Sequence, residues 1–145
     1  MSANVFDVAA YILEKQGLMS AMKLQKLVYY SQAWSLVWDD APLFANKIEA
    51  WANGPVVRDL YEKHKGNYQV SKNDIARFAS GNLSDNEKDT IDNVLGAFGN
   101  KSAQWLSDQT HSEDPWLKAR NGLTDSERGN REITLESMAE YFGAL

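Results

Sequence analysis

A long apolar pattern between residues 20 and 38 constrains the fold more than any other feature of the chain. Its apolar residues recur at helical spacing for about five turns, and further apolar residues lie beside the main stripe. The stripe consists of Leu24, Leu27, Val28, Ser31, Trp34 and Trp38, and it is widened by Tyr30, Ala33 and Val37. A helix that is apolar on several sides must be covered on several sides. The pattern therefore predicts a central helix that begins after a capping Ser20.

Shorter helical patterns lie on both sides of this segment. The earlier ones combine three- and four-residue apolar spacing with a capping residue or a glycine stop, and those after residue 100 are indicated by their capping residues. They predict helices over 5–16, 55–65, 85–98, 103–109, 115–120 and 135–142, with one or two further turns near 75–79. The expected caps include a Ser84–Glu87 capping box, Ser102, Asp114 and Thr134. Residues 121–132 are polar and predict a surface loop.

Evidence for β structure is limited to one region. Residues 44–51 show weak apolar alternation, which favours a short strand, with 68–70 as the expected partner. The turn Asn53-Gly54-Pro55 follows, and we expect Pro55 to occupy the first position of a helix. The fold class expected is therefore mainly α: a compact helical bundle forming a single domain over residues 1–145, with at most a short two-stranded β element.

Composition excludes several classes of function. The formal charge of −5 opposes general attraction to nucleic acid. The basic residues Lys23, Lys26, Arg58, Lys63 and Lys65 are interleaved with acids, which indicates a mixed solvated face. No cysteine is present, and the two histidines lack metal-binding spacing, so we expect no disulfide, no metal and no cofactor. No apolar run is long enough to span a membrane, and a cytoplasmic protein is expected.

Two sets of residues could suggest catalysis. Ser107, Asp108 and His111 would lie close together on one helix, as a loose imitation of a serine-histidine-acid triad, but working triads usually join separate segments and need an oxyanion hole. A cap at the helix end is the preferred interpretation of His111. Glu113 and Asp114 are adjacent carboxylates, which we interpret as an exposed side chain and a helix cap, respectively. The sequence therefore predicts no enzyme.

Aromatic residues suggest an interface instead. The five tryptophans and six tyrosines exceed what a small core requires, and tryptophan, tyrosine and arginine are enriched at the centres of protein interfaces. We expect Trp34 and Trp105 in the core, and core and interface remain equal alternatives for the tryptophans beside turns. The partner-binding residues expected around the Asn53-Gly54-Pro55 turn are Trp38, Trp51, Asn53, Arg58, Tyr61 and Trp116.

Several of these segments together resemble the Panacea domain, which is found in SocA-like and in phage-associated GepA-like proteins. The similarity is ordered and runs from about Val5 to Phe142. It is carried by the segments 23–30, 42–44, 50–51, 54–57, 60–61, 106–107, 110–111, 115–116 and 119–120.

The resemblance implies a largely helical antitoxin of a toxin–antitoxin system, which binds a cognate protein toxin directly and neutralises it. A second hypothesis is a proteolytic adaptor that delivers a bound client to an unfoldase or protease. A third, from another class, is a small hydrolase that uses His111 with Asp108 or Glu113. Nucleic acid and membranes are not expected partners.

Overall fold

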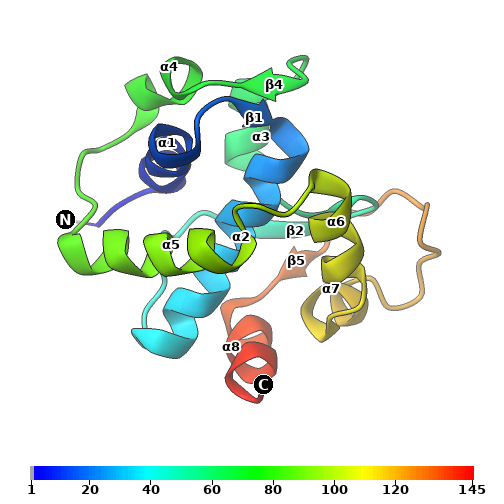
Figure 1. The fold of residues 1–145 in the computed structure, drawn as a ribbon. Coiled ribbons are helices and arrows are strands. Elements are labelled where there is room, and N and C mark those ends of the chain that lie inside the picture. Colours follow the sequence, from blue (N-terminus) through cyan, green and yellow to red (C-terminus); the bar gives the residue numbers. More distant parts are fainter. Residues whose placement is uncertain (1) are drawn as a thin grey trace.

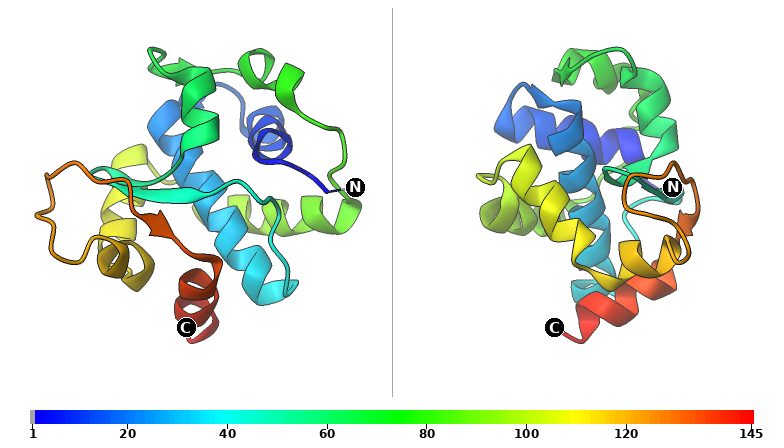
Figure 2. Two further views of the ribbon diagram at one scale, coloured as in Figure 1. Left: turned by 180° about the vertical axis from the view of Figure 1, so that it is seen from behind. Right: turned by 90° about the vertical axis from the view of Figure 1, so that its right-hand side faces the viewer.

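The computed structural model describes residues 2–145, and a single helix occupies its centre. This helix, α2 (Ala21–Trp38), packs against α1 (Val5–Gln16), α5 (Asp85–Phe98), α6 (Ala103–His111) and α8 (Leu135–Gly143). Figures 1 and 2 show these helices on different sides of α2. The mainly α fold and the central position of the 20–38 helix are therefore confirmed.

Local capping chemistry sets the ends of most helices. The hydroxyl of Ser20 accepts from the backbone of Lys23, and Ser84 forms the expected capping box with Glu87. Ser102 and Thr134 cap α6 and α8 in the same way. At α1 the N-cap is Asn4, which forms a capping box with Asp7. Each cap satisfies backbone N–H groups that lack a partner within the helix, so its position depends on nearby sequence alone.

Aromatic rings fill the space between α2 and its neighbours. Tyr30 stacks on Phe98 of α5 with ring centroids 4.5 Å apart, and Phe142 of α8 meets Tyr29, Tyr30 and Trp34 edge-on. The core is continuous through both contacts. Trp105, in contrast, is 40% exposed, so its expected place in the core was wrong.

The β structure consists of two small antiparallel sheets rather than one two-stranded element. Strands β2 (Ile48–Trp51), β3 (Gly54–Val57) and β5 (Glu132–Ile133) form a sheet in the order β3-β2-β5. Strands β1 (Met19–Ser20) and β4 (Gln69–Val70) form the other.

Two sequence predictions at this sheet were wrong. The strand ending at Trp51 pairs with β3 through a two-residue turn, in the register Trp51 to Gly54, and not with residues 68–70. Pro55 lies within β3, and the helix α3 (Arg58–His64) begins three residues later than expected. A tight turn favours local hairpin pairing, and the β-branched Val56 and Val57 favour an extended backbone.

The remaining elements are short. They are α4 (Lys72–Ile75), the 3-10 helix η1 (Ala76–Phe78) and α7 (Asp114–Ala119). The expected turns near 75–79 and the helix near 115–120 are thus present, and the segment between α7 and β5 contains no regular element, as expected. Across residues 2–145, no helix combines the length and the apolar character needed to cross a membrane.

Candidate functional site: a clamped hairpin

The β2–β3 hairpin is held from beneath by side chains of three helices and the residue after α7. Four backbone carbonyls of the hairpin accept hydrogen bonds from buried side chains. The pairs are Lys26 Nζ to Pro55 O (3.2 Å), Ser107 Oγ to Asn53 O (2.7 Å), Trp116 Nε1 to Trp51 O (2.8 Å) and Arg120 Nη1 to Ala50 O (3.1 Å). We call these four donors the clamp. Because the donors come from α2, from α6 and from α7 with its C-cap residue, the clamp ties the hairpin to three separate segments of the chain.

Gln25 extends this contact at the far end of β3. Its amide accepts from the backbone N–H of Val57 (2.9 Å) and donates to the carbonyl of the same residue (3.3 Å). The amide nitrogen also lies 3.0 Å from Nε2 of the buried His64. Burial lowers the pKa of His64, which favours the neutral imidazole there. The backbone N–H and carbonyl of Val57 therefore both have hydrogen-bond partners at the point where β3 ends and α3 begins.

Lys26 is the least expected member of the clamp. Its side chain is 1% exposed, although the sequence indicated a solvated position, and that interpretation was wrong. Burial lowers the pKa of Lys26 to about 7. The side chain passes directly under Gly54, where a Cβ atom would lie 2.6 Å from Lys26 Cε and 3.0 Å from Thr110 Oγ1. Gly54 also has a φ of +119°, so glycine is required there for two independent reasons.

His111 lies beside the clamp. Its ring stacks on that of Trp116, with centroids 4.1 Å apart and an interplanar angle of 20°. Burial, and then the nearby charge of Lys26, lower the pKa of the imidazole. Its Nε2 atom is buried and has no hydrogen-bond partner among the described residues.

The residues of the candidate triad have other partners. The hydroxyl of Ser107 donates to the carbonyl of Asn53, and the carboxylate of Asp108 accepts from Gln104 (2.9 Å). Within residues 2–145 no hydrogen bond joins either side chain to His111. The structure therefore brings these residues near one another on α6 without connecting them as a triad requires.

Glu113 and Asp114 occupy positions different from those expected. Glu113 is 3% exposed and is the N-cap residue of α7, whereas Asp114 is exposed and is the first residue of that helix. The hydroxyl of Tyr30 donates to both carboxylate oxygens of Glu113, at 3.1 and 3.2 Å. Burial raises the pKa of Glu113 to about 7, and the hydrogen bonds from Tyr30 and Gln109 partly oppose this rise. Adjacent acids are indistinguishable by sequence pattern, and only contact with α2 selects Glu113 for the interior.

The outer side of the hairpin carries an aromatic and charged group, which we call the Trp51 patch. It consists of Glu49, Trp51, Arg58 and Tyr61. The rings of Trp51 and Tyr61 meet edge-on, with centroids 4.8 Å apart, and the guanidinium of Arg58 lies 5.3 Å from the centre of the indole. Glu49 accepts from Trp51 Nε1 (2.8 Å) and pairs with Arg58 (3.3 Å). Half-buried rings and an exposed arginine are thus held in one arrangement.

Four of the six residues expected to bind a partner lie around the hairpin: Trp51, Asn53, Arg58 and Tyr61. Trp116 lies beneath it and is only 2% exposed, so its ring belongs to the interior. Trp38 is 12 residues along α2 from Lys26, about 18 Å at 1.5 Å per residue, and stacks on Trp34. The structure therefore separates Trp38 from the group.

Sequence reasoning did not assign three buried polar residues of this region, Gln25, Lys26 and Arg120, to the interior. The available signal was their position on the inward side of helical patterns, where polar residues are rarely left without a partner. Among residues 2–145 there is no group of three or more side chains suited to hold a metal ion.

Comparison with known families places these features in context. The family model described as "Antitoxin SocA-like, Panacea domain" matches residues 24–117, nearly two thirds of the chain, and the protein belongs to this family. The matched segment contains the hairpin, Gln25 and every member of the clamp except Arg120. No curated protein and no solved structure gives a significant match.

Proposed function

We propose that this protein is an antitoxin that binds a protein toxin directly and neutralises it by covering the toxin's active surface. The observation that carries the proposal is the match to an antitoxin family over the segment that builds the hairpin and most of its clamp. An antitoxin of this kind needs a stable recognition surface, and it needs no chemistry of its own.

The Trp51 patch is the contact surface we propose for the toxin. Trp51, Tyr61 and Arg58 are of the residue types that dominate binding energy at interfaces. Immobilising such side chains usually opposes binding, because rotamer freedom is lost. Here the backbone beneath Trp51 is already fixed by Trp116, and the indole itself is fixed by Glu49 and Tyr61. The side chains of the Trp51 patch are therefore already ordered in the free protein, and a partner that binds them does not have to immobilise them.

We also propose that neutralisation involves no catalysis by His111. The arrangement of α6 supports this, because the hydroxyl of Ser107 and the carboxylate of Asp108 are engaged by Asn53 and Gln104. The test is a His111→Ala variant, which should still neutralise the toxin if it folds. A folded variant that binds the toxin without neutralising it would instead support the hydrolase hypothesis.

Co-expression tests the proposal directly. The reading frame adjacent to the gene for this protein should arrest growth when expressed alone, and expression of this protein should restore growth. A purified complex of the two products should form without other components. A harmless neighbouring product, or one that stays toxic in the presence of abundant antitoxin, would contradict the proposal.

The half-life of the toxin separates direct neutralisation from the adaptor hypothesis. Under direct neutralisation, the toxin remains in cells as a stable complex, and its half-life does not fall when this protein is present. A shortened half-life that returns to normal in protease-deficient cells would favour delivery to a protease. Stoichiometric inhibition by purified protein in a toxin activity assay would favour direct neutralisation.

A further inference from the structure

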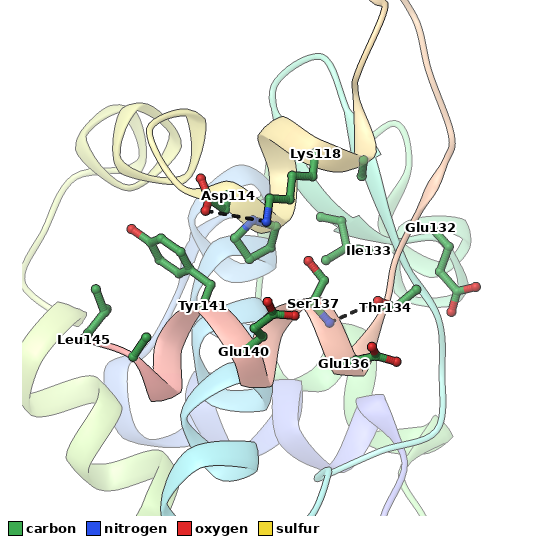
Figure 3. A pocket seen from close by; sticks show the side chains of 13 residues that line it. Asp114, Lys118, Glu132, Ile133, Thr134, Glu136, Ser137, Glu140, Tyr141 and Leu145 are labelled. Carbon is green, nitrogen blue, oxygen red and sulfur yellow. Dashed lines mark hydrogen bonds and ion pairs between the residues drawn. The ribbon is translucent and has the colours of Figure 1, made fainter.

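A second surface of the molecule has the form of a groove. It lies between α7, β5 and α8, has a volume of about 620 Å³, and is separate from the Trp51 patch in its lining residues. Figure 3 shows Asp114 and Lys118 on α7 and Glu136, Glu140 and Tyr141 on the facing helix α8.

The groove combines apolar and acidic lining. Pro115, Ala119 and Tyr141 supply apolar surface, and four carboxylates lie around it, from Asp114, Glu132, Glu136 and Glu140. The one lining cation, Lys118, pairs with Asp114 at 3.8 Å. The glutamates at 132, 136 and 140 are exposed and form no ion pair within residues 2–145.

This arrangement is unfavourable for the isolated protein. Glu136 and Glu140 are four residues apart on α8, a spacing at which like charges destabilise a helix. Glu140 also lies toward the C-terminal end, where the helix dipole disfavours a negative charge. Some acids elsewhere on the surface pair with cations, as in the pairs Glu14–Lys72 and Glu62–Lys65, whereas exposed acids such as Asp89 form no ion pair within the described residues. At this groove, three carboxylates without an ion pair among the described residues lie beside apolar surface.

We propose that this groove binds a lysine- and arginine-rich amphipathic segment of the toxin. This inference rests on the proposed antitoxin function, and it adds a second contact surface for the toxin and the kind of toxin segment that would bind there. Apolar side chains of the segment contact Pro115, Ala119 and Tyr141, while its cations pair with the free carboxylates. The nine residues of α8 extend about 13 Å, a length that matches two to three turns of a helical partner. Charge complementarity of this kind also speeds association and makes it salt-dependent.

Most residues that line the groove lie outside the segment matched by the family model, which supports a contact with the partner of this particular protein. The family match ends at residue 117, and apart from Asp114 and Pro115 every lining residue lies beyond it. The hairpin and most of its clamp lie within the match. The two surfaces are thus built by different parts of the chain.

Charge-neutral variants test the groove against the toxin. The triple variant Glu132→Gln, Glu136→Gln, Glu140→Gln keeps side-chain shape and removes the three free charges. The control variant Glu14→Gln, Asp89→Asn, Asp125→Asn makes the same change in net charge at exposed positions elsewhere. We expect toxin affinity at 50 mM salt to fall at least tenfold for the groove variant and less than threefold for the control. The loss should shrink at 300 mM salt. Equal affinities for the two variants would overturn the proposal.

A peptide probe tests the groove even if the neighbouring product is not a toxin. The basic amphipathic peptide LKKLLKLLKKLLKL, added to the 15N-labelled protein, should shift backbone amide resonances of α7, β5 and α8, and the groove variant should abolish these shifts. Shifts spread over other acidic surfaces, or unchanged shifts in the groove variant, would refute the groove as a basic-segment site. Failure of toxin neutralisation together with groove-specific peptide shifts would refute only the antitoxin function.

Discussion

The ammonium group of Lys26 donates a hydrogen bond to the carbonyl oxygen of Pro55, 3.2 Å away, at a place where the lysine side chain is almost completely buried. This contact joins the central helix α2 to the hairpin that carries the Trp51 patch. A buried lysine is unfavourable unless its surroundings compensate for lost hydration. Incomplete compensation lowers the pKa of the lysine, because the charged form is the one that loses hydration.

Replacement of Lys26 by methionine should change how stability depends on pH. Burial lowers the pKa of Lys26 from 10.5 to about 7, so between pH 7 and 9.5 the unfolded chain retains a proton that the folded protein has lost. The free energy of unfolding of the wild type should therefore rise with pH across this range, by up to about 1.4 kcal/mol per pH unit. Lys26→Met should lack this rise in urea unfolding at pH 7, 8 and 9.5. Parallel pH profiles for the two proteins would contradict the burial of a titrating lysine.

Alanine at Gly54 should destabilise the protein more than alanine at Gly66. Both glycines have positive φ, +119° and +88°, and alanine in such a conformation costs about 1–2 kcal/mol. At Gly54 the new Cβ would also collide with Lys26, whereas at Gly66 no atom lies within 4 Å. Overpacking should add about 1–3 kcal/mol at Gly54 alone. Chemical denaturation of the two variants measures the difference, and equal losses would show that Lys26 moves aside freely.

Trp116→Phe should weaken the clamp. Phenylalanine fills much of the same space but cannot donate to the carbonyl of Trp51, and the loss of one such hydrogen bond costs about 0.5–1.5 kcal/mol. Trp105→Phe is the matched control, because Trp105 is 40% exposed and its indole nitrogen donates to no side chain or carbonyl in the described chain. We expect a loss below about 0.5 kcal/mol for the control. Similar thermal unfolding midpoints for both variants would argue against the clamp.

Trp51→Ala should reduce affinity for the proposed toxin partner without unfolding the protein. Trp51 is the centre of the Trp51 patch, and truncation of such a residue typically costs at least about 1–2 kcal/mol of binding free energy. Trp38→Ala is the comparison, since Trp38 is 48% exposed but lies at the C-terminal end of α2, whereas Lys26 contacts the hairpin from the N-terminal part of that helix. Isothermal titration calorimetry should detect weaker binding for Trp51→Ala only. A larger loss for Trp38→Ala would move the interface to the C-terminal end of α2.

Glu113→Gln should remove a second pH effect, of opposite sign. Burial raises the pKa of Glu113 from 4.5 to about 7, so between these values the folded protein retains a proton that the unfolded chain has lost. Wild-type stability therefore contains a contribution that falls as pH rises from 4.5 to 7. Glutamine can still accept from Tyr30, and the variant should lack this fall. The test compares the difference in unfolding free energy between pH 5 and 7.5 in the two proteins.

Sequence reasoning succeeded where the controlling interactions are local. The Ser84–Glu87 capping box and the caps at Ser102 and Thr134 involve residues within one turn of each other, and all three are present. It failed for the partner of β2, because strand pairing depended on a turn type that the pattern alone left open. The sequence also led us to expect Trp105 in the core, but neighbouring elements leave 40% of this residue exposed.

The amino-acid sequence alone sufficed to predict a mainly helical chain, the capped starts of α2, α5, α6 and α8, and the resemblance to the Panacea family. The folded arrangement was needed to select Lys26 and Glu113 for the interior, to place Trp116 beneath the hairpin, and to separate Trp38 from Trp51. The physical reason is range. Caps and helical periodicity depend on neighbours a few residues away, whereas burial, and the protonation of any buried group, depends on residues brought together from distant parts of the chain.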